Sequence, residues 1–157
     1  MKEHFPLFIS SRGKKVLVVG GGKIATRRIL TLTNFEFEIT VVAPNITNEI
    51  QQLADDGLVT HIQREFRNED LDGKFLVVAA TDKREINKYI GEKAKELGAY
   101  VSVADVKEEC NFYFPAVIVK DEIVVGVTGD GKSHKKVKEI SNKIRKVLKH
   151  ENQSGQP

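Results

Sequence analysis

The sequence predicts an α/β fold: a Rossmann-like, mostly parallel sheet with helices on both faces, followed by a C-terminal β-hairpin and a terminal helix. Short β-branched runs alternate with helical patterns through roughly the first two-thirds of the chain, as in parallel-sheet domains. The first run stops at Gly20-Gly21-Gly22, and a helical pattern follows directly. Right-handed crossovers between such strands predict the strand order 3-2-1-4-5.

The expected strands are apolar runs rich in valine and isoleucine, as is typical of strands buried on both faces. The first reads VLVV, the second is stopped by Pro44, and the third follows Gly57. The fourth contains FLVVAA, and the fifth follows Gly98. We expect these strands at residues 14–19, 37–43, 58–62, 74–80 and 100–103.

The expected helices have recognisable starts and stops. Thr47, with Glu49 behind it, is an N-cap candidate, because its hydroxyl can accept a backbone N–H of the first turn. Asp82 and Glu85 have the spacing of a capping box, which would make Asp82 the N-cap of the third helix. Gly98 is a suitable C′ residue for that helix. The helices are expected at residues 23–34, 47–54 and 83–97.

Gly20, Gly22 and Ala25 fit the G-x-G-x-x-G/A pattern of dinucleotide-binding folds. Gly20 permits the tight turn, Gly22 lets the backbone approach a pyrophosphate, and a small Ala25 lets the helix pack on the strand. The pyrophosphate would lie on the free N–H groups of the helix N-terminus. Pro44 and Asn45 stand where many such folds place an acidic residue, so this position does not decide between NAD and NADP.

The last third of the chain predicts a different arrangement. Residues 111–119 and 122–127 are expected to form an antiparallel hairpin added to the sheet, with a turn at Lys120-Asp121. A helix with an apolar stripe and dense lysine and arginine should follow at 133–148. We therefore divide the chain into a dinucleotide-binding domain (1–110), a hairpin and helix (111–150) and a disordered tail (151–157).

Ligands of open parallel sheets bind beyond the carboxyl ends of the strands. This rule brings residues 20–25, 43–45, 80–82 and 104–105 to one crevice. Asp105 ends the fifth strand there, and its carboxylate could act as a general base. The sequence leaves open a second interpretation, in which Asp105 only caps a helix or turn.

Residues 126–133 match the G-x-x-x-x-G-K-[ST] pattern of phosphate loops. A true phosphate loop follows a parallel strand, whereas a hairpin strand is expected here. We therefore expect a simpler anion site at the helix start, formed by Lys132 and Ser133.

Composition excludes several classes of protein. The single cysteine excludes an internal disulfide, and the four histidines lack ligand spacing, so no metal site is expected. No apolar stretch approaches the roughly 20 residues that span a bilayer, and no signal-peptide pattern is present, so a cytoplasmic location is expected. The net charge of +3 favours anionic partners. No recognised motif supports nucleic-acid binding.

Several segments together resemble the precorrin-2 dehydrogenase family, the NAD-dependent module of sirohaem synthase. The matching segments are PLFISSRGKKVLVVGGGKIATRR, ITVVAP, VVAATDKREIN, SVADVKEECNFYFPAVI and VTGDGKS. That family also has proline where an acidic residue is usual, here Pro44. The resemblance implies oxidation of precorrin-2 to sirohydrochlorin with hydride transfer to NAD⁺.

The resemblance also implies roles for particular residues. Asp105 matches the essential aspartate of the family, a proposed general base. The polycarboxylate tetrapyrrole substrate gives Lys132 and Ser133 a binding role, and the region after the fifth strand is implied to form a homodimer. Relatives that also insert iron carry a longer helical domain after the hairpin, so ferrochelatase activity is not expected. The residues assigned to the cofactor are Gly20, Gly22, Lys23, Ile24, Ala25, Pro44, Asn45 and Thr81.

A non-enzymatic alternative is an NAD-binding sensor, like the regulatory domains of potassium channels and transporters. Such domains share the glycine pattern and a similar end to the fourth strand. They usually keep the acidic residue after the second strand and do not need an aspartate at position 105. The sequence therefore favours the enzyme.

Overall fold

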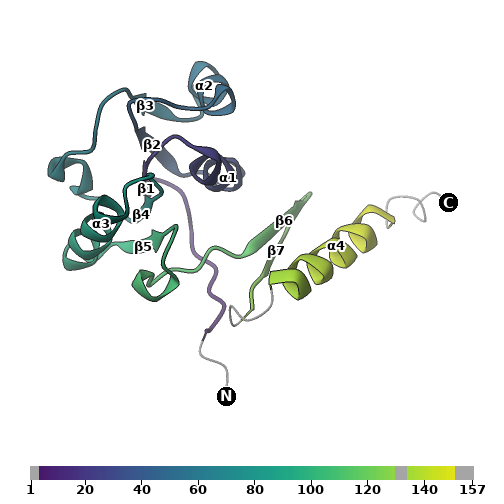
Figure 1. The fold of residues 1–157 in the computed structure, drawn as a ribbon. Coiled ribbons are helices and arrows are strands. Elements are labelled where there is room, and N and C mark those ends of the chain that lie inside the picture. The colour runs from purple at the N-terminus through teal and green to yellow at the C-terminus, as the bar shows by residue number, and fades with distance from the viewer. Residues whose placement is uncertain (1–3, 130–133, 151–157) are drawn as a thin grey trace. The chain divides into compact units, whose positions relative to one another are not determined.

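The computed structural model describes residues 4–129 and 134–150, so the tail expected at 151–157 lies outside the described residues. The chain divides into two compact units. The larger unit is Ser10–Phe112, and the smaller combines Met1–Ile9 with Tyr113–Pro157. Figure 1 shows the elements of both units, which are described separately below.

The larger unit is a five-stranded, fully parallel sheet in the order β3-β2-β1-β4-β5, which confirms the expected fold and strand order. Three α-helices accompany this sheet. Two short 3-10 helices lie in loops that the sequence did not predict as helical. The strands are β1 (Lys15–Val19), β2 (Glu38–Val42), β3 (Thr60–Ile62), β4 (Leu76–Ala79) and β5 (Tyr100–Val103). The helices are α1 (Lys23–Leu32), α2 (Asn48–Asp55), η1 (Asn68–Leu71), α3 (Arg84–Glu96) and η2 (Lys107–Glu109).

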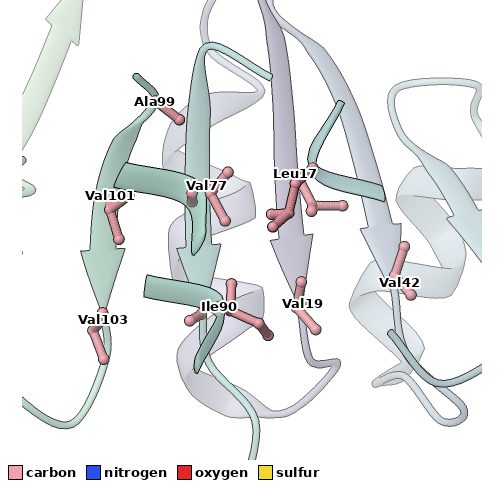
Figure 2. Packing of buried hydrophobic residues seen from close by; sticks show 11 residues of the cluster. Leu17, Val19, Val42, Val77, Ile90, Ala99, Val101 and Val103 are labelled. Atoms are coloured by element: carbon pink, nitrogen blue, oxygen red, sulfur yellow. The ribbon is translucent and has the colours of Figure 1, made fainter. Parts of the chain in front are cut away.

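The central strands are buried on both faces because helices cover both. The chain leaves β1 toward β2 in one direction and β4 toward β5 in the other, so right-handed crossovers place α1 and α3 on opposite faces (Figure 1). On the α3 face, Leu17, Val77 and Val101 of neighbouring strands pack with Ile90 of the helix (Figure 2). Alternate residues such as Val18 are equally buried, which explains the continuous apolar runs.

The start of α3 differs from the expected capping box. Lys83 is the N-cap and makes no side-chain cap hydrogen bond. Thr81 takes part in the turn instead, because its Oγ1 accepts the N–H of Lys83 at 3.2 Å. Asp82 lies one residue before the N-cap, so its assignment as N-cap is wrong. The other two capping expectations are confirmed: the Thr47 hydroxyl accepts an N–H of the first turn of α2, and Gly98 follows α3 with φ +80°.

The smaller unit contains β6 (Ala116–Lys120) and β7 (Ile123–Val127), which pair antiparallel as a sheet of their own. The expectation that this hairpin extends the parallel sheet is therefore wrong. The turn is at Asp121, with φ +51°. Helix α4 (His134–His150) contacts both strands, and Ser141 on its inner side is 1% exposed.

The strand expected at residues 111–119 begins only at Ala116. The preceding residues pair with the outer edge of β5, since the N–H groups of Asn111 and Phe112 both donate to the Val101 carbonyl at 3.1 Å. The Asn111 side chain accepts the N–H of Val101 at 2.5 Å. Pro115 lacks an N–H for a ladder.

Within the described residues, no helix is long and apolar enough to cross a bilayer.

Replacing Asp70 by asparagine tests the ion pair that fixes η1. Arg64 donates to both carboxylate oxygens of Asp70, at 2.8 and 2.6 Å, and these hydrogen bonds hold the pKa of Asp70 below its ordinary value of 3.8. Because the folded-state pKa is lowered, the ionised pair stabilises the fold above pH 3.8 and is lost as the pH falls through the lowered value. We expect Asp70→Asn to lower the urea midpoint at pH 7.

The control for this experiment is Glu36→Gln. Glu36 pairs with Arg12, but both side chains are well exposed, at 64% and 81%, where ion pairs contribute little. The urea midpoint of the Glu36→Gln variant should stay close to that of the wild type. Equal midpoints for wild type and Asp70→Asn at pH 7 would contradict the assigned role of Asp70.

Candidate active site

The carboxyl ends of the parallel strands are held together by backbone hydrogen bonds that continue one residue past each strand. The N–H of Gly20 donates to the last carbonyl of β2 at 3.0 Å, and the N–H of Ala80 donates to the last carbonyl of β1 at 2.9 Å. The N–H of Ala104 donates likewise to the last carbonyl of β4 at 2.9 Å. The loops after β1, β2, β4 and β5 therefore start in fixed positions along one edge of the sheet.

The turn after β1 fits between its two neighbouring loops only because it lacks side chains. A Cβ on Gly20, whose φ is +112°, would lie 2.2 Å from the Ala80 carbonyl oxygen. A Cβ on Gly21 would lie 2.1 Å from the Asn45 carbonyl oxygen. Both distances are far below van der Waals contact, so these two glycines are required by the packing of the protein itself.

Gly22 has a different environment. It is exposed, and no described atom lies within 4 Å of the position of a Cβ there. As the N-cap of α1 it offers no side chain to the first N–H groups, and the first turn holds no acidic residue. An open, uncapped helix N-terminus with Lys23 in its first turn fits a pyrophosphate. The residues present therefore fit a dinucleotide.

The glycine turn is tied to α2 by threonine hydroxyls. The N–H of Thr47 donates to the Gly21 carbonyl at 3.1 Å. The Thr47 hydroxyl also lies 2.9 Å from that of Thr26, which donates to the Gly22 carbonyl at 3.0 Å. Thr26 is 7% exposed, so this small network is inside the protein. It fixes the turn relative to the Pro44–Asn45 segment.

The end of β2 offers a dinucleotide no carboxylate. Pro44 and Asn45 are exposed there, so the Asn45 amide is the polar side chain directly after the strand. Glu38 is the first residue of β2, at the opposite end of the strand. A ribose at this position would therefore meet an amide and a proline ring in place of an acid.

The loop after β4 is organised by a buried asparagine that sequence reasoning did not single out. Asn87 of α3 is 2% exposed. Its Oδ1 accepts the backbone N–H of Thr81 at 2.9 Å and the Thr81 hydroxyl at 2.7 Å. Its Nδ2 donates to the Thr81 carbonyl at 3.0 Å. Thr81, expected to contact a cofactor, is thus held next to the Gly20 turn.

Asp105, two residues after β5, faces α3. Its Oδ1 accepts Nδ2 of Asn87 at 3.4 Å, and its Oδ2 lies 3.7 Å from Nε of Arg84. Arg84 also donates to Glu109, and that hydrogen bond is the largest of the effects that hold the pKa of Arg84 above its ordinary value. The N-cap of η2 is Val106, and it makes no side-chain cap hydrogen bond. The side-chain contacts of Asp105 are therefore with α3, and Asp105 is not the N-cap of η2.

The structure thus brings most of the candidate residues to one edge of one unit. Gly22, Lys23, Ile24, Pro44 and Asn45 are exposed there, whereas Gly20 and Ala25 shape the turn and its packing on the strand. Lys132 and Ser133 lie outside the described residues. Within 4–129 and 134–150, no group of three histidine, cysteine, aspartate or glutamate side chains could hold a metal ion. Sequence reasoning placed Gly21 in the crevice without a role of its own, and it did not identify Asn87.

Comparison with known proteins is consistent with this geometry. Residues 7–116 match a family model described as "Putative NAD(P)-binding". A "probable multifunctional siroheme biosynthesis protein" of Ruminiclostridium josui is 47% identical over 145 residues, which cover 92% of this chain and 28% of that protein. A siroheme synthase of Photorhabdus laumondii is 35% identical over 146 residues, covering 93% and 31%.

Among solved structures, the precorrin-2 dehydrogenase SirC has a TM-score of 0.78 and 31% sequence identity. The match covers 91% of this chain and 70% of that one. By contrast, the chain spans less than a third of the length of these two curated relatives, at 28% and 31%.

Alanine at Gly21 should lower the stability of the fold, whereas alanine at Gly22 should mainly lower the affinity for NAD⁺. Gly21→Ala is expected to destabilise the fold by about 2 kcal/mol or more, because its Cβ meets backbone. Gly22→Ala should cost less than about 1 kcal/mol but weaken NAD⁺ binding about tenfold or more, because its Cβ enters the space for the pyrophosphate. Thermal unfolding and calorimetric titration with NAD⁺ measure the two effects. Unchanged NAD⁺ affinity in a folded Gly22→Ala would contradict the assigned pyrophosphate position.

Proposed function

Because this chain belongs to the precorrin-2 dehydrogenase family, we propose that it oxidises precorrin-2 to sirohydrochlorin and passes the hydride to NAD⁺. The observation that carries the proposal is the location of Asp105. Its carboxylate lies at the end of β5, on the same edge of the sheet as the uncapped N-terminus of α1. A hydride acceptor and a proton acceptor can therefore approach one substrate from the same edge of the sheet, from loops that are separated by the loop after β4.

The reaction removes one hydride and one proton from the macrocycle as its conjugation grows. NAD⁺, when bound, supplies the acceptor for the hydride. The backbone N–H groups at Gly22 and Lys23 would hold the pyrophosphate of the cofactor, and the Asn45 amide would be available to its ribose. A carboxylate oxygen of Asp105 accepts the proton and later releases it to water. Asp105 is 36% exposed in its side chain, so both steps have access to solvent.

The substrate carries many carboxylates, and the chain offers cations to meet them. Lys132 and Ser133 directly precede α4 in the sequence, and we assign them to one of these carboxylates as an anion site. The strand before them, β7, is antiparallel, which argues against a nucleotide-binding phosphate loop. The basic exposed side chains of α4 add electrostatic attraction for a polyanion.

The non-enzymatic alternative is not favoured. A sensor has no need of a carboxylate at position 105, and the relatives reported above are named as biosynthetic proteins. Such relatives also accord with a cytoplasmic location, which we include in the proposal. The end of β2 lacks the acidic residue usual in sensor domains.

Asp105→Asn tests the proposed base. The variant keeps the size of the side chain but removes the proton acceptor, so we expect turnover of precorrin-2 with NAD⁺ to fall about 10²- to 10⁴-fold. NADH absorbance and the sirohydrochlorin spectrum follow the reaction, and NADP⁺ in parallel reports the cofactor preference. Affinity for NAD⁺ should change little. Undiminished turnover by Asp105→Asn would refute the mechanism, and no turnover by the wild type would refute the proposed function.

We also propose that the smaller unit forms a homodimer. Several of its large apolar side chains are exposed, including Ile140 (40%) and Val147 (60%) on α4 and Ile123 (45%) on β7. Ile140 and Val147 are seven residues apart and so lie on one face of the helix. An apolar stripe on an exposed helix is typical of a surface that is covered by a partner.

Ile140→Glu tests the homodimer. A charge on this stripe should weaken self-association about tenfold or more, because a carboxylate must lose its hydration to enter an apolar contact. Sedimentation equilibrium measures the dissociation constant. Asn142→Glu, on an exposed position of the same helix, is the control and should leave association unchanged. A wild type that is monomeric at high concentration would exclude the dimer.

A further inference from the structure

The buried amide of Asn87 connects two loops of the site. It lies in the first turns of α3 and bonds to Thr81 at the end of β4 and to Asp105 at the end of β5. At 2% exposed it is among the few buried polar residues described. A buried amide is costly unless its donors and acceptor are satisfied, so its four hydrogen bonds explain why an asparagine is suited to this position.

The orientation of this amide is determined by its partners. The backbone N–H of Thr81 can only donate, so the atom 2.9 Å from it must be Oδ1. The NH₂ group is then turned toward the Thr81 carbonyl and the Asp105 carboxylate, which can accept. The hydrogen bond to Asp105 is the longest of the four, at 3.4 Å.

We propose that Asn87 is a positioning residue for the dehydrogenation, acting through Asp105. This inference rests on the proposed function. Nδ2 of Asn87 holds Oδ1 of Asp105, while Arg84, three residues earlier on α3, lies beside Oδ2. Two side chains of one helix turn thereby fix the plane of the carboxylate. Since the same amide holds Thr81 beside the Gly20 turn, the proton acceptor and the cofactor loop share one support.

A double-mutant cycle measures this coupling. Asn87→Asp keeps an acceptor for the Thr81 N–H and hydroxyl, but it removes the donor to the Thr81 carbonyl and to Asp105 and places a second carboxylate beside Asp105. Asn87→Ala removes the donor and the acceptor without adding a charge. In the wild-type background we expect each to lower kcat about 10- to 100-fold, from the loss of a hydrogen bond to a charged group and, for Asn87→Asp, also from repulsion between the two carboxylates. In an Asp105→Asn background the same substitutions should lower the residual kcat less than about threefold, because the residue through which they act is already inactive.

Asn68→Asp is the matched control. Asn68 accepts the Tyr89 hydroxyl at the surface of α3, at 3.1 Å, and a carboxylate can accept it equally well. This variant should keep wild-type kcat and NAD⁺ affinity. Thermal unfolding and NAD⁺ titration show whether each variant is folded. If Asn87→Ala is unfolded, the cycle is measured with Asn87→Asp alone.

The outcomes separate the two proposals. A large effect of Asn87→Asp with wild-type Asp105, and almost none in the Asp105→Asn background, supports the positioning role. An equal fold-loss in both backgrounds, or a loss that appears only as weaker NAD⁺ binding, overturns this inference and leaves the proposed function intact. No turnover by the wild-type chain overturns both.

Discussion

The close approach of three backbones at the carboxyl edge of the sheet is the constraint on which the site depends. Gly20 lies against Ala80, and Gly21 lies against Asn45, at distances that leave no room for a Cβ. This packing sets the direction in which α1 begins. Gly20 and Gly21 make the contacts with the neighbouring loops, and Gly22, the next residue, is left open to solvent. Packing and ligand binding thus use different glycines of one run.

Helix α3 is the second support of the site. Its apolar side, with Ile90 and Ala94, belongs to the buried cluster beneath β1, β4 and β5. Its first turns carry the polar residues Arg84 and Asn87, which lie against Asp105. The cluster that stabilises the fold therefore also holds the polar groups of the site in place, and a rigid element supports a carboxylate that belongs to a loop.

The fold could be predicted largely from the sequence because its signals are local. Apolar runs, the glycine turn and the Thr47 cap each act within a few residues, and right-handed crossovers then give the strand order. Asp82 was wrongly assigned as a cap because spacing alone does not show that Thr81 serves the same turn. The hairpin was placed on the wrong sheet because Asn111 pairs with β5 through its side chain, a contact with no periodic signal.

The site was predicted only in part for a similar reason. Residues that follow strands can be listed from the sequence, and this rule gives Asn45, Thr81 and Asp105 as candidates. Asn87 lies inside a helix, where its spacing resembles that of any polar residue. The role that we propose for it depends on Asp105, in the loop after β5, which is 18 residues away in the chain. Arg84 was not predicted for the same reason, because its partners Asp105 and Glu109 are more than 20 residues away in the chain.

The way Asn111 and Phe112 bond to β5 has a consequence for aggregation. An uncovered outer strand offers a row of backbone groups to any other chain, and such edges promote fibril growth. Here the N–H and carbonyl of Val101 are both occupied by the chain's own next segment. At the opposite edge, β3 has three residues, which is too short to be an effective template. The parallel sheet is therefore protected at both ends against the addition of foreign strands.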